Sequence, residues 1–233
     1  MAKRHLTQMC ILAASLAGLS QLAAPPDAHS QNLSACPKID GGLNLSVQVD
    51  QGRVVYDHTL NKAQLRRLAS RSQGATLRPG EQPLGLTRRN MQTGSSMESQ
   101  TVNLSRGRYC ARLSKVNIKI NFNQLKVYVL KDYRRGSCQY DAVLAHEHRH
   151  VSLSREVLTK HRSIIERKIR RRILGMKPAV TSSRNRANQQ MYSRLERLLV
   201  PLIKDMEREM NAANEKIDTP ASYARFKKHC RRW

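Results

Sequence analysis

Residues 136–151 read Gly-Ser-Cys-Gln-Tyr-Asp-Ala-Val-Leu-Ala-His-Glu-His-Arg-His-Val, and the chain changes its periodicity within them. Before this stretch, apolar residues recur at every second position; after it, they recur with a helical period. Ser137 suits a helix N-cap, and Asp141 places a negative charge in the first turns, where the helix dipole favours it. The sequence therefore predicts a long helix that begins at Ser137 and ends at about Leu174, before Gly175.

An HExxH motif, His146 to His150, lies on this helix. Positions i and i+4 lie one above the other, so both imidazoles can bind one metal ion while Glu147 reaches the attacking water as a general base. Both histidines fall on the inward apolar stripe that contains Val143 and Leu153. Two core histidines satisfied by hydrogen bonds are the alternative. The spacing favours a zinc site with His146 and His150 as ligands and Glu147 as the catalytic residue.

A third protein ligand is needed, and the sequence near the motif does not supply it. The glycine break that would bring a third histidine back to the metal is absent, and Glu156 would lie roughly 9 Å from His150 along the helix axis. The ligand should therefore come from a second helix, which the helical period predicts from near Ser183 to about Lys216.

If these two helices form an antiparallel hairpin, the numbers of two facing residues should sum to about 356. Position 148 in the motif would then face about position 208, which lies between Asp205 and Glu209. We expect Glu209 to be the third ligand and Asp205 to accept the second N–H of a ligating histidine. The alternative is that this part of the helix seam is exposed to solvent. Asp218 is a further candidate ligand, and Tyr192, Tyr223 and His161 are available to stabilise an oxyanion.

Strand patterns dominate the first half of the chain. Leu43 to Tyr56 predicts a hairpin around Asp50-Gln51-Gly52, and Val116–Phe122 with Leu125–Val129 predicts a second hairpin around Asn123-Gln124. A strand is also indicated at Thr101–Leu104.

The segments between these strands are predicted as follows. Residues 61–70 form a short amphipathic helix, and residues 71–100, rich in Gly, Pro and Ser, form a loop with one short strand near Leu84–Thr87. A short third helix follows Asp218 or Thr219, with Pro220 in its first turn. The expected fold is α+β: a small antiparallel sheet packed against the long HExxH helix, followed by an antiparallel helical hairpin.

The first residues are typical of a signal peptide. A basic start, an apolar run from Met9 to Ala24 and the small-residue site Ala28-His29-Ser30 predict that residues 1–30 are removed on export. Residues 31–233 then form a single domain, mainly β with one short helix over 31–135 and helical over 136–233. No segment of the mature chain is apolar enough to span a membrane. We expect a periplasmic or secreted protein; a lipoprotein anchored at Cys36 is the alternative.

Four cysteines remain after cleavage, an even number that predicts two disulfides in an exported chain. We favour Cys110 with Cys138 and Cys36 with Cys230 among the three possible pairings. A thiolate zinc site is the alternative, but the chain has no CxxC pair.

The chain is strongly basic, and loss of residues 1–30 lowers its formal net charge only from +25 by one, to +24. This charge predicts salt-sensitive attraction to anionic surfaces such as envelope polymers or lipid head groups. Nucleic acid is a less suitable partner because few aromatic residues are interleaved for base stacking. Many of the charges form an arginine-rich run from Arg155 to Arg172, which would lie on the outer face of the HExxH helix.

The order of these features resembles a family of uncharacterised bacterial secreted zinc-dependent proteases, which are gluzincin-like in their HExxH motif. The similar segments are Tyr56-Asp57-His58, Gly85-Leu86-Thr87, Cys110 with its strands, and Gly136-Ser137-Cys138-Gln139-Tyr140 into the motif, and they extend to Asn214-Glu215-Lys216-Ile217-Asp218. This resemblance implies a zinc site at His146 and His150 with Glu147 catalytic. The chain departs from the family pattern at Arg149, which replaces a common Gly, and at Val151-Ser152.

The expected function is that of a zinc-dependent metallohydrolase, a peptidase that acts on a peptide or protein substrate. The Leu125–Leu130 strand would border the cleft, and an extended substrate could add to its edge. The alternative is a non-catalytic envelope protein that binds anionic polymers through its basic surface.

Overall fold

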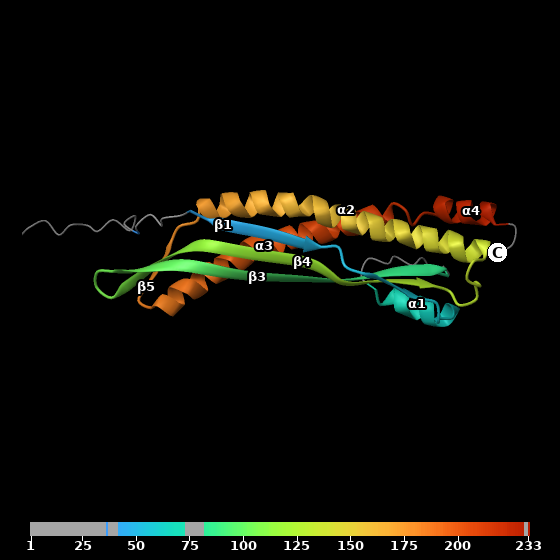
Figure 1. Ribbon diagram of the computed structural model, residues 1–233, viewed down its shortest axis with the longest axis horizontal. Coiled ribbons are helices and arrows are strands. Elements are labelled where there is room, and N and C mark those ends of the chain that lie inside the picture. Colours follow the sequence, from blue (N-terminus) through green and yellow to red (C-terminus); the bar gives the residue numbers. More distant parts are fainter. Residues whose placement is uncertain (1–35, 37–41, 73–81, 231–232) are drawn as a thin grey trace, which may run out of the picture. The chain divides into compact units, whose positions relative to one another are not determined.

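A single long strand organises the sheet of this protein (Figure 1). The computed structural model describes residues 36, 42–72, 82–230 and 233. In chain order the elements are β1 (Asn44–Asp50), β2 (Val54–Asp57), α1 (Lys62–Ser70), β3 (Gly85–Leu104), β4 (Arg108–Val129), α2 (Cys138–Leu174), β5 (Ala179–Thr181), α3 (Arg184–Glu215) and α4 (Pro220–His229).

Strand β4 lies at the centre of a sheet that is mixed, and the expectation of an antiparallel sheet is therefore wrong. β3 pairs antiparallel with β4 along its whole length. The other edge of β4 is shared by three short strands: β5 is antiparallel to it, whereas β1 and β2 are parallel to it. The predicted hairpin of residues 43–56 is also wrong, because β1 and β2 follow one another along β4 and both run in the same direction.

The second predicted hairpin, around Asn123-Gln124, is one uninterrupted strand. The register of β3 against β4 shifts between Asn90, which pairs with Gln124, and Met91, which pairs with Phe122. One extra residue in β4 is therefore a β-bulge, and it keeps Phe122 and Leu125 on the same buried face. The break in the alternating pattern indicated a turn, but a bulge breaks the pattern in the same way.

Strand β3 is far longer than the short Leu84–Thr87 strand expected there, and the loop predicted over the rest of residues 82–100 is wrong. Its Gly, Ser and Gln residues are compatible with a strand because one of its faces is exposed to solvent along most of its length. Pairing with twenty residues of β4 holds it, so tertiary pairing outweighs its weak strand propensity. The predicted Thr101–Leu104 strand is confirmed as its last part.

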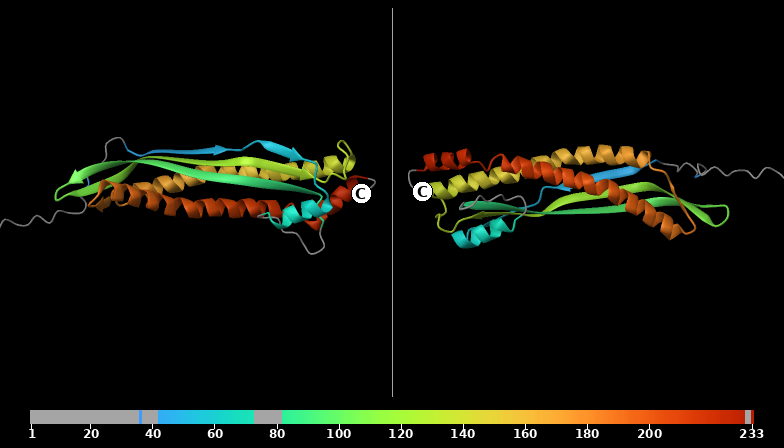
Figure 2. Two further views of the ribbon diagram at one scale, coloured as in Figure 1. Left: turned by 90° about the horizontal axis from the view of Figure 1, so that it is seen from below. Right: turned by 180° about the vertical axis from the view of Figure 1, so that it is seen from behind.

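The two long helices cover one face of the sheet, and α1 covers part of the other (Figures 1 and 2). The main core lies between the sheet and α2 and α3, and its buried residues include Ile118 and Phe122 of β4 together with Leu158, Ile165 and Leu195 of the helices. A smaller core joins α1 to the opposite face, through Leu65, Ala69, Leu86, Tyr128 and Leu130. The helical half of the chain is thus anchored on the alternating apolar residues of β4.

The helices confirm the boundaries expected from the sequence. α1 begins after Asn61, whose side chain forms a reciprocal capping box with Gln64. α2 begins after Ser137, whose hydroxyl accepts the Tyr140 N–H, and Gly175 caps its end. α3 and α4 begin after Ser183 and at Pro220.

Two disulfides form among the four expected cysteines, but the favoured pairing is wrong. Cys36 is bonded to Cys110, and Cys138 is bonded to Cys230. The first joins the start of the described chain to β4, and the second joins the start of α2 to the end of α4. The sulfur of Cys36 is used in its disulfide, so the structure contradicts a lipid anchor at that residue.

The predicted signal peptide, residues 1–30, lies outside the described residues. Within the described part of the chain, none of the helices combines the length and the apolar character that crossing a membrane requires. Residues Cys36–Trp233 form one compact unit.

Candidate metal centre

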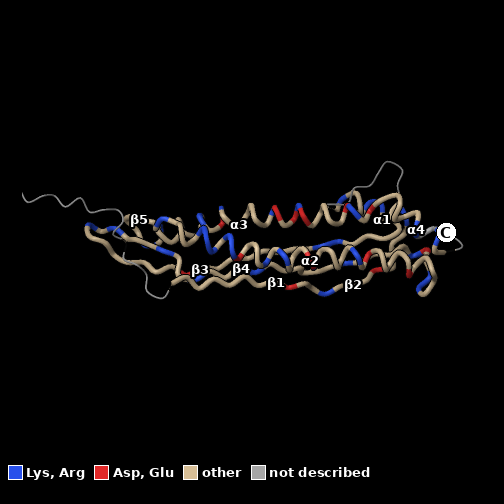
Figure 3. The backbone as a smooth tube through the Cα atoms, turned by 90° about the horizontal axis from the view of Figure 1, so that it is seen from above, with Lys and Arg blue, Asp and Glu red and all other residues tan. Residues whose placement is uncertain are grey.

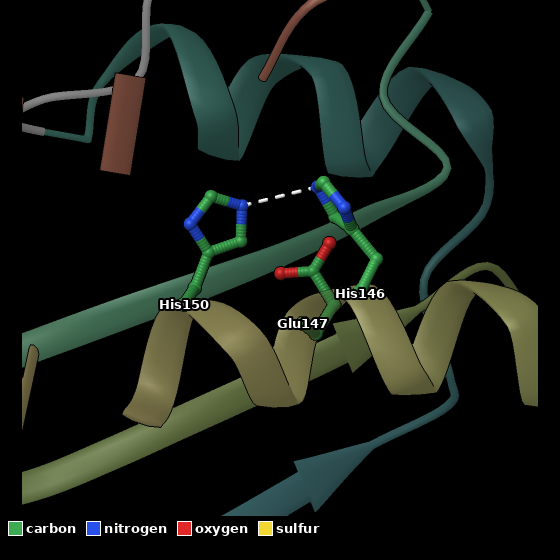
Figure 4. A group of neighbouring side chains, drawn as sticks. All are labelled: His146, Glu147 and His150. Carbon is green, nitrogen blue, oxygen red and sulfur yellow. Dashed lines mark hydrogen bonds between the residues drawn. The ribbon is translucent and has the colours of Figure 1, made fainter. Parts of the chain in front are cut away.

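The first third of α2 brings His146, Glu147 and His150 together (Figure 4). All three side chains are buried, with relative exposures of 5%, 4% and 8%. Their candidate ligand atoms lie within 4.8 Å of one another, and this group could hold a metal ion. The proximity of the three side chains that the helical spacing predicted is therefore confirmed, and His150 faces Asn214 near the end of α3.

A fourth residue, Asp218, completes this cluster from the turn between α3 and α4. Its Oδ1 lies 2.9 Å from Nε2 of His146 and 3.0 Å from Nε2 of His150, and the two Nε2 atoms are 3.1 Å apart. In a tetrahedral zinc site with bonds of 2.0–2.1 Å, neighbouring ligand atoms are about 3.3 Å apart. The triangle formed by these three atoms is close to that size, so these donors fit a small divalent cation.

The protonation pattern of His150 supports the same conclusion. Asn214 donates from Nδ2 to the carbonyl of Met210 (2.6 Å), which leaves its Oδ1 to accept from Nδ1 of His150 at 2.7 Å. Nδ1 therefore carries the proton in neutral His150, and Nε2 presents its lone pair to the carboxylate of Asp218. His150 is buried, and a lone pair that it directs at a carboxylate requires a proton or a cation between the two groups.

A second layer of hydrogen bonds fixes Asn214 and the backbone around it. Ser154 donates to the carbonyl of His150 (2.7 Å) and accepts from the buried guanidinium of Arg89 (3.1 Å). Arg89 also donates to Oδ1 of Asn211 at 2.7 Å, which ties β3 to the last turns of α3. These contacts hold α3 in the register that delivers Asn214 and Asp218.

Glu147 points toward the start of β3 rather than toward α3. Thr87 donates to its Oε2 at 2.8 Å. A Cβ atom at Gly85 would lie 2.5 Å from Oε1 of Glu147 and 2.7 Å from Val143, so the carboxylate occupies space that only glycine leaves free. Burial raises the pKa of Glu147, although the neighbouring His150 and His146 oppose this.

The pKa of Asp218, the other acidic residue of the site, is shifted in the opposite direction. Burial alone would raise the pKa of Asp218, but its hydrogen bonds with His146 and His150 outweigh this and lower the value to about 2. Burial would lower the pKa of His150, but its contacts with Asp218 and Glu147 raise it. The site therefore holds one firmly ionised carboxylate beside the histidines and one carboxylate with raised proton affinity.

The two acidic residues favoured from the sequence lie elsewhere. Glu209 binds Lys160 (2.6 Å) and Nε2 of His161 (2.9 Å), and Asp205 forms an ion pair with Arg208 on the surface of α3. The reason is the register of the helical hairpin. His150 faces Asn214 and His161 faces Glu209. The residue numbers of these pairs sum to 364 and 370, rather than to about 356. The chain between α2 and α3 has the expected length, but it forms strand β5, which pairs with β4. The chain therefore does not fold straight back from α2 into α3, and the facing positions are shifted by two or more turns.

The sequence missed Asn214, Thr87 and Arg89, and it named Asp218 only as a further candidate. Of the possible oxyanion partners, Tyr223 is the nearest, with its ring centroid 5.7 Å from that of His146. Tyr192 is exposed on α3, and His161 is bound to Glu209. An acidic residue in the turn that ends a helix facing the motif was the available signal for Asp218.

The Leu125–Leu130 segment does not offer a free edge beside the site, so that expectation is wrong. It is the last part of β4 and pairs with β2 on one side and β3 on the other. The strand that borders Glu147 is the start of β3, through Gly85 and Thr87.

No protein-family model matches the chain, and no curated protein or solved structure is detectably similar to it.

Proposed function

We propose that this protein is an exported zinc-dependent metallohydrolase that cleaves peptide bonds. The observation that carries the proposal is the convergence of Nε2 of His146, Nε2 of His150 and Oδ1 of Asp218 within 3.1 Å of one another, with Glu147 buried beside the two histidines. His146, His150 and Asp218 would hold the ion. Zinc bound there would supply a Lewis acid and lower the pKa of a water molecule.

Glu147 would act as the general base. Its carboxylate is held by Thr87 beside the histidines, and burial gives it the raised pKa that a base needs to accept a proton from water and later return it to the leaving amine. Asn214 would keep His150 in the tautomer that directs Nε2 to the metal. Each polar group of the site thus has a role in either ligation or proton transfer.

A peptide substrate is favoured by the strand beside Glu147. Among the described residues, β3 pairs only with β4, so its outer edge can accept an extended chain by backbone hydrogen bonds. Gly85 and Thr87, at the start of this strand, would bring such a chain close to the Glu147 carboxylate.

The two disulfides favour a location outside the cytoplasm. Two disulfides are compatible with a periplasmic or extracellular protein, because cytosolic thiols are kept reduced. The resemblance to secreted zinc-dependent proteases, carried by the HExxH segment, agrees with this assignment.

The test is metal content together with cleavage of an unfolded protein substrate. We expect the purified protein to bind one zinc ion, and Glu147→Gln to retain the ion while cleavage falls by about 100-fold or more. The control is Glu156→Gln, an exposed glutamate on the same helix, which should cleave like the wild type. Equal cleavage by wild type and Glu147→Gln, or a protein that binds no metal, would overturn the proposal.

A further inference from the structure

The end of the molecule opposite the metal centre carries an unbalanced positive charge. Between residues 167 and 195 the chain has nine Lys and Arg and no Asp or Glu. These residues span the last turns of α2, strand β5 and the first turns of α3, and Figure 3 shows Lys and Arg positions gathered around β5 and the start of α3. Seven of the nine are exposed, and we call the five that follow residue 170 the basic tip: Arg171, Arg172, Lys177, Arg184 and Arg186.

The basic tip differs from the rest of the arginine-rich run on α2. Arg155 donates to the carbonyls of Gln51 and Gly52, between β1 and β2, and Arg162 donates to that of Val47 in β1, so both have structural partners. Within the described residues, no carboxylate forms an ion pair with a member of the basic tip. Its charges are therefore directed to solvent and are available to an external anion.

An exposed apolar side chain lies between the residues of the basic tip along the chain. Leu174, the last residue of α2, is 68% exposed, which makes it the most exposed large hydrophobic residue of the described chain. Its neighbours along the chain include Arg171, Arg172 and Lys177. A single exposed leucine is ordinary on a protein surface, but this one ends a helix whose last turn carries two exposed arginines, and an exposed lysine follows three residues later.

We propose that the basic tip is a docking surface for an anionic lipid bilayer, with Leu174 inserted at the level of the head groups. Cationic side chains are attracted to anionic lipids, and an apolar side chain among them gains from burial at the acyl boundary. A soluble polyanion would use the arginines but would have no use for Leu174. This apolar residue therefore favours a lipid surface over a soluble polymer.

The geometry separates this surface from the metal centre. Glu147 and Leu174 lie on the same helix, about 40 Å apart at ~1.5 Å per residue. Docking through the tip would therefore leave the metal centre away from the bilayer. Lipid binding should consequently be independent of metal, and chelation should not change it.

The experiment is co-sedimentation of the full chain with vesicles of phosphatidylcholine alone and of phosphatidylcholine with phosphatidylglycerol. We expect binding only to the anionic vesicles, weakened by salt. Arg171→Gln/Arg172→Gln should weaken it on the order of 25-fold, about fivefold for each charge. Leu174→Ser, which changes no charge, should weaken it about tenfold.

The matched control is Arg66→Gln/Arg67→Gln on α1, which removes the same charge from exposed positions of another helix and should bind within about twofold of wild type. Circular dichroism will establish that each variant is folded. Equal binding by the tip variants and the wild type would overturn the proposal. So would an unaffected Leu174→Ser combined with equally strong binding to soluble polyphosphate, which would assign the tip to a soluble polyanion.

Discussion

Two clusters of histidine and carboxylate lie along the seam between α2 and α3, three helical turns apart. In the first, His146, His150 and Asp218 converge on one point, and in the second, His161 meets Glu209. Both histidine groups are buried, and both carboxylates come from the C-terminal part of the chain. The first is a candidate metal centre, whereas the second is an ion pair completed by Lys160.

The two clusters differ in the second group that binds the carboxylate. Glu209 is shared with the ammonium group of Lys160, which supplies the positive charge that a metal would otherwise bring. At the first cluster no lysine or arginine among the described residues forms an ion pair with Asp218, and both His146 and His150 contact its carboxylate instead. The first cluster is therefore the candidate metal centre, because a second histidine and not an ammonium group accompanies its carboxylate.

The largest expected effect contrasts the two carboxylates directly. Asp218→Ala removes one of the three converging donors and should lower zinc affinity by more than about 100-fold, whereas Glu209→Ala should leave it within about twofold. Competition with a chromophoric chelator measures both. A greater loss of affinity in Glu209→Ala than in Asp218→Ala would reverse our assignment of the two clusters.

A smaller effect is expected from the residue that orients His150. Asn214→Ala should lower zinc affinity by about 10-fold to 100-fold, because Nδ1 of His150 loses its acceptor and the ring can turn or change tautomer. Asn188→Ala is the control, since Asn188 accepts hydrogen bonds from Ser99 and Thr101 at the other end of α3. Unchanged affinity in Asn214→Ala would show that the tautomer does not need this amide.

The disulfides offer a test of how the first cluster is held. The Cys138–Cys230 bond ties the end of α4 to the start of α2, and Asp218 lies just before α4. Replacing both cysteines by serine should lower zinc affinity by about tenfold, because the turn that carries Asp218 loses its support.

The control is the same replacement of Cys36 and Cys110, which removes the other disulfide. Either loss should reduce the free energy of unfolding by about 2–4 kcal/mol. Only the loss of Cys138–Cys230 should change metal affinity, and an equal change in both variants would contradict a local role.

The smallest effect concerns the ion pair of the second cluster. Hydrogen bonds from Lys160 and His161 lower the pKa of Glu209 below its ordinary value of 4.5. A lowered folded-state pKa stabilises the protein above pH 4.5, and this contribution is lost as the pH falls through the folded-state pKa. In chelator-treated protein, Glu209→Gln should cost no more than about 1 kcal/mol at neutral pH, since Glu209 is partly exposed.

Denaturant titrations across the acid range measure this difference. The gap between wild type and Glu209→Gln should shrink as the pH falls from 4.5 through the lowered folded-state pKa of Glu209, below which both proteins lack the negative charge. Glu215→Gln, at an exposed position of the same helix, is the control. A gap that stays constant down to acid pH would mean that the charge of Glu209 does not stabilise the fold.

Local patterns predicted the helices well because helix signals are local. The caps at Asn61, Ser137 and Gly175 and the proline that begins α4 each depend on residues within one turn. The strands were predicted less well. Alternation identified the buried face of β4, but a bulge looked like a turn, and the length of β3 depends on its partner rather than on its own composition.

His146, Glu147 and His150 could be assigned without a structure, because five consecutive residues of one helix set their relative positions. Asp218 and Asn214 could not, because their distance from the motif depends on the register between α2 and α3. That register is set by β5 and by packing against the sheet, which are contacts between residues far apart in the chain. Spacing along a single helix is determined by backbone geometry alone, whereas the approach of two helices is determined by everything packed around them.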